Sequence, residues 1–292
     1  MNGDQSWQSE YPFTSRWLEI NGQRYHFIRE GCGEHTILAV HGNPTWSFYW
    51  RKVVAQFSSA MQVVAVDHIG CGLSDKPQQY DYCLRTHADN LKRLIENEDL
   101  RNITLLAHDW GGAIGLLALT EQKERFERII LLNTGAFPPP FVPWRIGVLR
   151  APLLGTFAIR GLNVFAGMAI KMAMSRRKLH PAAAKGLLAP YQNWHDRVAI
   201  DQFVRDIPLT ERHRTHQTLR ELEASLPNLG DLPALFIWGM RDWCFRPECM
   251  ARLQESMPHA RTVPIADAGH YVMEDATEEV LTAIDHFLKE TG

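Results

Sequence analysis

Residues 105–112, with the sequence LLAHDWGG, decide how this chain folds. A short apolar run ends at His108 and small residues then open a helical stretch, which is the strand, turn and helix order of a nucleophile elbow. Such an elbow needs small residues two positions before and after its nucleophile, and Ala107 and Gly111 flank Asp109 in this way. Asp109 is therefore a candidate carboxylate nucleophile, although a helix N-cap role would also explain it.

Strands and helices alternate along most of the chain on either side of this stretch. Two short runs around Asn21-Gly22 predict an antiparallel hairpin. Buried parallel strands are expected at 36–40, 62–66, 103–107, 129–132, 234–238 and, more weakly, 260–265. Helices are expected at 46–59, 85–98, 111–122, 247–256 and 275–289. The pattern predicts an α/β fold with a mostly parallel, eight-stranded sheet and helices on both faces.

The alternation stops between Pro138 and Leu232, where a Pro-rich stretch is followed by helical sequence rich in Met, Ala and Gly. We interpret residues 138–232 as a helical cap domain and residues 1–137 and 233–292 as the main domain. Ligands of such sheets bind at the carboxyl ends of the strands, which is the edge that the cap is expected to cover.

Two later segments place a polar side chain directly after a predicted strand. Asp242 ends the sequence IWGMRD, and His270 ends the sequence DAGH. The chain order of Asp109, Asp242 and His270 is nucleophile, acid and base, which is similar to the order of an α/β-hydrolase triad. An aspartate is ionised at pH 7, so Asp109 can attack saturated carbon and form an ester. His270, oriented by Asp242, can then activate the water that hydrolyses this ester.

A third motif supplies donors for a leaving anion. Residues 41–46, HGNPTW, follow a predicted strand, and backbone N–H groups here and at Trp110 are expected to form an anion hole. Asn43 and Trp110 add an uncharged amide and an indole donor. An Asx turn before Pro44 would also explain Asn43.

The composition excludes several other classes of protein. The 292 residues are 45% hydrophobic and 22% charged, which is typical of a folded globular chain. With 31 basic and 33 acidic residues, the net charge of −2 gives no sign of nucleic-acid binding. The N-terminus lacks a secretory h-region, and charged residues and a proline interrupt residues 146–174 too often for a transmembrane helix. We expect a cytoplasmic protein.

No cofactor or metal is expected. The five cysteines show no C-x-x-C spacing, so neither a zinc site nor a disulfide framework is indicated. His213 and His216 stand near Glu211 at helix-like spacing, but without a fourth ligand an exposed polar helix face explains them better.

The charges are distributed unevenly. Residues 128–195 hold nine basic residues and no acid, so the other 22 basic residues share the rest of the chain with all 33 acids. One interpretation is that the arginines of the cap pair with acids of the main domain. The other is a basic, apolar docking face for acyl substrate, a membrane surface or partner proteins, the last giving a homo-oligomer or a multienzyme assembly.

Four motifs together resemble the haloalkane dehalogenases of the α/β-hydrolase superfamily: HGNPTWS at 41–47, DHIGCGLSDKP at 67–77, HDWGG at 108–112 and DAGHY at 267–271. The resemblance implies that Asp109 is the nucleophile, His270 the base and Asp242 the acid, with Trp110 and Asn43 stabilising the halide. One branch of the family carries its acid after the sixth strand, but residues 132–135, LNTG, hold no carboxylate. The pattern is similar to the third dehalogenase subfamily.

The resemblance leaves the substrate open. It implies a hydrolase that displaces halide from alkyl halides, yet the β-lactone decarboxylases of bacterial long-chain olefin synthesis share the same motifs. Either substrate is apolar, and neither reaction needs a cofactor. An epoxide hydrolase is disfavoured, because Asn43 stands where those enzymes carry an aromatic residue and the cap has one tyrosine, Tyr191, where two are needed.

Overall fold

The sheet at the centre of the molecule has eight strands in the order β1-β2-β4-β3-β5-β6-β7-β8. The computed structural model describes residues 7–292. Its strands are β1 (Ser15–Ile20), β2 (Gln23–Glu30), β3 (Thr36–Val40), β4 (Gln62–Val66), β5 (Ile103–Asp109), β6 (Phe126–Thr134), β7 (Ala234–Gly239) and β8 (Arg261–Ile265). β2 pairs antiparallel with β1 and β4, and the other pairs are parallel. The predicted eight-stranded, mostly parallel sheet is confirmed.

The local sequence explains these strands. All residues of β3, β4, β5 and β7 are buried, as expected for β-branched and apolar runs that are covered on both faces. The hairpin between β1 and β2 turns at Asn21 and Gly22, whose φ angles are 53° and 75°. Asn and Gly tolerate this left-handed backbone better than other residues, which is why the Asn-Gly pair marks the turn in the sequence.

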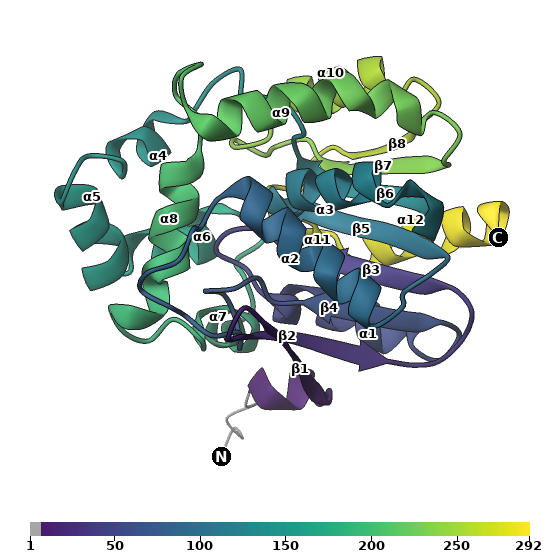
Figure 1. The fold of residues 1–292 in the computed structure, drawn as a ribbon, viewed down its shortest axis with the longest axis horizontal. Coiled ribbons are helices and arrows are strands. Elements are labelled where there is room, and N and C mark those ends of the chain that lie inside the picture. The colour runs from purple at the N-terminus through teal and green to yellow at the C-terminus, as the bar shows by residue number, and fades with distance from the viewer. Residues whose placement is uncertain (1–6) are drawn as a thin grey trace.

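Helices cover both faces of the sheet (Figure 1). One hydrophobic core lies under α2 (Leu84–Asn97), α3 (Trp110–Glu121) and α10 (Pro247–Ser256). A second lies under α1 (Arg51–Phe57), α11 (Val272–Asp275) and α12 (Thr277–Thr291). Shorter helices are η1 (Trp7–Glu10), η2 (Ser47–Trp50) and η3 (Lys123–Arg125).

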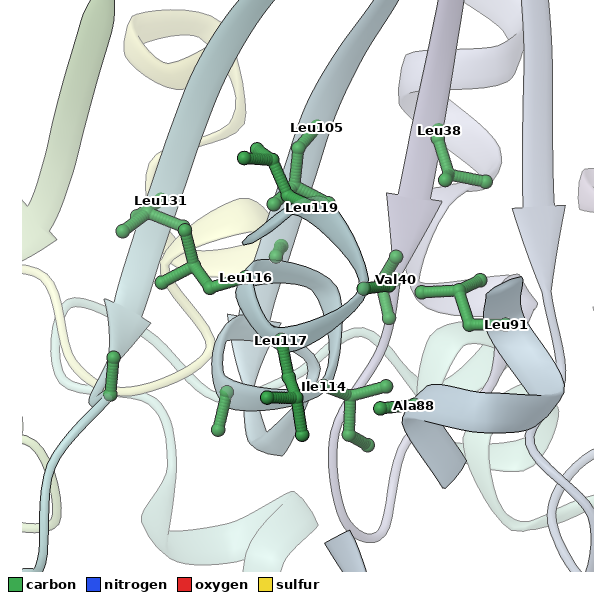
Figure 2. Packing of buried hydrophobic residues seen from close by; sticks show 14 of the residues in the cluster. Leu38, Val40, Ala88, Leu91, Leu105, Ile114, Leu116, Leu117, Leu119 and Leu131 are labelled. Atoms are coloured by element: carbon green, nitrogen blue, oxygen red, sulfur yellow. The ribbon is translucent and has the colours of Figure 1, made fainter. Parts of the chain in front are cut away.

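α3 is buried along most of its length, from Gly111 to Leu119. Figure 2 shows its leucines and Ile114 packed between the strands and α2, with Leu105 and Leu91 among the neighbours. Each such fully buried side chain is worth about 1.5–3 kcal/mol. The N-terminus of α3, where Asp109 sits, is therefore anchored in the hydrophobic core.

Between β6 and β7 the chain is helical. The elements are α4 (Trp144–Val148), α5 (Leu154–Thr156), the π-helix η4 (Phe157–Gly161), α6 (Val164–Met172), α7 (Pro181–Leu188), η5 (His195–Arg197), α8 (Val198–Asp206), α9 (Arg214–Ser225) and η6 (Leu226–Leu229). α4, α5, α6 and α8 lie together to one side of the sheet, at the left of Figure 1, whereas α9 packs against α2 and α3. The cap boundaries at 138 and 232 stay a prediction.

No helix within residues 7–292 is both long enough and apolar enough to cross a lipid bilayer.

Candidate active site

The turn at Asp109 has the strained geometry of an elbow. Its φ is 54° and its ψ is −130°, a conformation that costs free energy in a residue with a side chain and is typical of functional sites. A Cβ on Gly111 would collide with the carbonyl oxygen of Val40, and one on Gly112 would collide with the hydroxyl of Thr134. These contacts explain why the turn is followed by two glycines.

The Asp109 carboxylate is buried in a cradle of backbone donors. The N–H of Asn43 donates to Asp109 Oδ1 at 2.7 Å, and the N–H of Trp110 also hydrogen-bonds the carboxylate. Burial raises the pKa of Asp109, and although His270 and the two N–H donors act in the opposite direction, the pKa stays above its ordinary value. Gly42 is required beside it, because a Cβ there would collide with the carboxylate.

The other two triad candidates meet Asp109 at this point. His270 Nε2 lies 3.6 Å from Asp109 Oδ2, and His270 Nδ1 lies 2.8 Å from Asp242 Oδ2. Burial disfavours the charged imidazole, but the carboxylates of Asp242 and Asp109 outweigh it, so the pKa of His270 is raised. The structure thus brings together all three residues that the sequence singled out, although their roles stay predictions.

Asp242 is fixed by partners that the sequence analysis did not identify. Its Oδ1 accepts the N–H of Cys244 at 2.7 Å, and its Oδ2 accepts the side-chain amide of Asn133 at 3.0 Å. Asn133 also exchanges two hydrogen bonds with the backbone of Gly239. The end of β6, noted in the sequence only for lacking a carboxylate, therefore holds an amide that positions the carboxylate after β7.

The side chains of Asn43 and Trp110, next to the Asp109 carboxylate, differ in the residues that they contact. The indole of Trp110 lines the adjoining pocket, with its ring centroid 5.6 Å from that of Phe203. The side-chain amide of Asn43 donates to the carbonyl of Ile200 in α8 at 3.3 Å. Its Oδ1 is buried without a partner, so the structure does not contain the Asx turn that was the alternative explanation for Asn43.

The motif at 67–77 supports the loop that carries Asn43. The buried carboxylate of Asp67 accepts the N–H of Ser47 at 2.6 Å and that of Leu73 at 2.8 Å, and it pairs with His26 at 2.8 Å. Burial raises its pKa, but His26, His41 and the N–H of Leu73 lower it by more, so the net pKa is depressed. This network fixes Ser47, the residue at which the 41–46 loop ends.

A second missed residue, Asp275, joins the cap to the loop of the candidate base. Its carboxylate accepts the N–H of Gly269 at 2.8 Å, that of Ser175 at 2.7 Å and that of Arg176 at 3.1 Å. The N–H of Tyr271 donates to the carbonyl of Ala173 at 2.9 Å. We call these contacts the clasp. In the sequence Asp275 is one more acid at a helix start, so nothing there points to this role.

An apolar pocket opens from Asp109 and His270 under the cap. The empty space that it lines is about 1280 Å³, a figure that includes open solvent at its mouth. Its walls come mainly from the apolar residues Ala113, Phe137, Phe141, Val142, Ile146, Leu149, Phe165, Met168, Met172, Val204, Ile207, Leu219, Trp243 and Phe245. Arg145 is the one basic residue in the lining apart from His270. Such a pocket suits an extended alkyl substrate.

The structure offers no metal site in the part that it describes, residues 7–292. Tyr191, the single cap tyrosine, is fully buried and bonds the backbone at Gly72 and Thr45, so it does not face the pocket. Cys71 is also buried, and burial raises the pKa of its thiol to about 12, which makes it unreactive.

The chain matches the model of the alpha/beta hydrolase fold family over residues 35–157 and 171–277. It is 41% identical to a cis-3-alkyl-4-alkyloxetan-2-one decarboxylase of Shewanella oneidensis, over 96% of this chain and 90% of that protein. It is 31% identical to haloalkane dehalogenase 2 of Mycobacterium bovis, over 94% of each. Its fold matches the tetrameric structure of the haloalkane dehalogenase DpaA from Paraglaciecola agarilytica with a TM-score of 0.81 and 26% identity, over 94% of this chain and 93% of that one.

Proposed function

This chain belongs to the alpha/beta hydrolase fold family, among haloalkane dehalogenases and cis-3-alkyl-4-alkyloxetan-2-one decarboxylases, and from that premise we propose that it is an enzyme that opens β-lactones bearing two long alkyl chains. The observation that carries the proposal is that the buried carboxylate of Asp109, the candidate nucleophile, faces a pocket whose walls are almost entirely apolar. The greater identity to the decarboxylase supports it.

The first step is nucleophilic attack at saturated carbon. Asp109 Oδ2 bonds the ring carbon that carries the ring oxygen, and the bond from that carbon to the ring oxygen breaks. The ring opens to a free carboxylate, and the substrate is held as an alkyl ester of Asp109. The N–H donors at Asn43 and Trp110 and the Trp110 indole stabilise the negative charge that shifts from Asp109 to the leaving carboxylate.

The second step releases the products. The bond between the substrate carboxylate and its neighbouring carbon breaks, and its electron pair forms the carbon–carbon double bond. The ester bond breaks at the same time and returns its electron pair to Asp109, so carbon dioxide and an alkene leave. No water is consumed and no proton is transferred. His270 then acts through its charge, since the raised pKa favours the imidazolium beside the Asp109 carboxylate.

Displacement of halide from an alkyl halide is the second candidate function. The pair of uncharged donors at Asn43 and Trp110 favours it, because a halide leaving Asp109's target carbon needs hydrogen-bond donors and no proton. The ester would then be hydrolysed by water that His270 activates, with Asp242 orienting the imidazole. In this reaction oxygen from water enters Asp109 and then the alcohol.

The two candidates are separated by turnover in water enriched with ¹⁸O. A cis-3,4-dialkyl oxetan-2-one with two long chains is compared with 1-bromobutane at equal concentrations. We expect the lactone to turn over faster, to yield alkene and carbon dioxide, and to leave Asp109 free of ¹⁸O after many turnovers. Faster turnover of the bromide, with ¹⁸O entering Asp109, would assign the enzyme to dehalogenation.

Oligomerisation is a separate matter. A related dehalogenase has a tetrameric structure, and for this chain a homo-oligomer or multienzyme assembly stays a prediction that light scattering of the purified protein can check.

A further inference from the structure

Six large apolar side chains on the outside of the cap stand in solvent. They lie on α4, α5, η4 and the adjoining turns, on the side of the molecule away from the sheet in Figure 1. The exposed fractions are 85% for Leu153, 75% for Leu154, 72% for Trp144, 64% for Leu162, 62% for Val148 and 55% for Phe157. We call these six residues the outer cap face. Monomeric proteins rarely leave so many large apolar groups together in water unless they bind something.

The segment that carries the outer cap face is basic. Residues 128–195 contain no acid, Arg145 and Lys171 are exposed, and the guanidinium of Arg145 lies against the exposed Trp144 ring. The alternative that the cap arginines pair with acids of the main domain holds for Arg176, which bonds Asp267 and Glu279. It does not hold for Arg150 and Arg160, which bond backbone carbonyls in the cap. These two arginines therefore do not pair with acids of the main domain, although Asp206 and Asp201 of α8 lie near them, and Arg145 is the exposed cation within the face.

The outer cap face continues into the candidate site. In α4, Ile146 lines the pocket, as Leu149 does just after the helix, whereas Trp144 and Val148 are exposed. Arg145, between them, also lines the pocket, and its guanidinium lies 5.4 Å from the centre of the Trp144 ring. One short helix thus separates the apolar pocket from the apolar surface, and an alkyl chain could pass between them without crossing bulk water.

We propose that the outer cap face docks onto an anionic lipid bilayer and that long-chain substrate enters the pocket from it. Leucine, phenylalanine and tryptophan would enter the interfacial region, while Arg145 and Lys171 reach the phosphates. A second copy of the chain fits less well, because an isologous contact would place the same basic face against itself. The purpose of the docking rests on the proposed long-chain substrate, but the docking itself does not.

The experiment is flotation of the purified full chain, without substrate, on vesicles of phosphatidylcholine alone or of phosphatidylcholine mixed with the anionic lipid phosphatidylglycerol. The double variant L153S/L154S removes the two most exposed leucines, which touch neither pocket nor triad. The charge variant is K171E. The control is W17S, which changes a half-exposed tryptophan on β1, far from the cap.

We expect the wild type and W17S to float with the anionic vesicles. The partition coefficient should fall at least about tenfold for L153S/L154S, because two leucines lose their burial, and less for K171E. All variants should keep wild-type turnover of 1-bromobutane or a short-chain lactone, so a failure of docking is separable from a failure of the proposed reaction. The proposal would be overturned if L153S/L154S floats as well as the wild type, or if the wild type stays in the dense bottom fraction in the presence of anionic vesicles. If the wild type is an oligomer and L153S/L154S dissociates it, the outer cap face would instead be a protein–protein contact.

Discussion

The polar base of the pocket, which we call its floor, and its apolar sides, which we call its walls, are held together by different kinds of contact. On the floor, Asp109, Asp242 and His270 each contact named polar partners, which come from strand ends, from the turns after them or from the start of α3. The walls are mostly apolar side chains, drawn from the cap and from main-domain residues such as Trp243 and Phe245. In a site of this kind, substitutions in the walls alter which substrate fits, because apolar contacts can repack. Substitutions in the floor instead remove hydrogen bonds that hold the candidate triad in place.

Of all substitutions in the floor, replacement of the candidate nucleophile should reduce turnover the most. Asp109→Asn keeps the shape but removes the attacking oxygen, and we expect turnover of any substrate to fall by at least about 10⁴-fold. The wild type should itself lose activity as the pH falls through the raised pKa of Asp109, since only the ionised form attacks. Steady-state rates over a pH series check both points. Normal turnover by Asp109→Ala would refute the covalent mechanism.

His270→Gln should divide the two reactions that the floor can perform. Hydrolysis of the Asp109 ester needs an imidazole to activate water, so bromoalkane turnover should fall about 10³-fold and the ester should accumulate. Mass spectrometry of the peptide containing Asp109 would detect the added alkyl group. Alkene formation from the lactone should fall much less, because it consumes no water. Equal losses in both reactions would contradict the water-free second step.

Trp110→Phe tests the indole N–H donor, which lies between the polar floor and the apolar walls of the pocket. The variant keeps the aromatic wall but removes the indole N–H, and we expect dehalogenation to slow by about 10²-fold. Bromide should also quench the tryptophan fluorescence of the wild type more than that of the variant. An unchanged rate with a brominated alkane would assign this indole to packing.

Asp275→Asn loosens the clasp without touching the pocket. The amide can no longer accept three N–H bonds with full charge, so the His270 loop should shift, and we expect kcat to fall about tenfold while KM changes little. The matched control is Asp285→Asn, which loses an exposed pair with Lys289 on α12. A thermal melt on the same samples separates loss of fold from loss of alignment. A rise in KM alone would show that Asp275 serves the cap only.

A change in the walls should alter selection and not chemistry. Met168→Trp adds bulk to a side chain that lines the pocket on α6. We expect kcat/KM for a long dialkyl lactone to fall about fivefold, roughly the contribution of one or two buried methylenes, with no change for a short one. Leu73→Trp, at an exposed site outside the pocket lining, controls for added bulk. An equal fall for both substrates would show that the walls also hold the floor in place.

The sequence predicted the floor better than the walls, for physical reasons. The spacing around Asp109 is constrained by backbone contacts with Val40 and Thr134, so small residues are required and leave a readable motif. The predicted bounds of the strands and helices lie close to the observed ones, because the spacing of apolar residues follows from which side of each element is buried. Asn133 and Asp275 were missed because Asp242 is 109 residues from Asn133 and Ser175 is 100 residues from Asp275. The cap gave no motif, since apolar packing accepts many sequences.

The clasp couples the position of the candidate base to the position of the cap. The carboxylate of Asp275 accepts the N–H of Gly269, beside His270, and the N–H groups of Ser175 and Arg176, which follow α6. The N–H of Tyr271, on the other side of His270, donates to the carbonyl of Ala173 in the same cap segment. A displacement of this segment would break its bonds to Asp275 and Tyr271 together, so a substitution that moves the cap would also reach the imidazole.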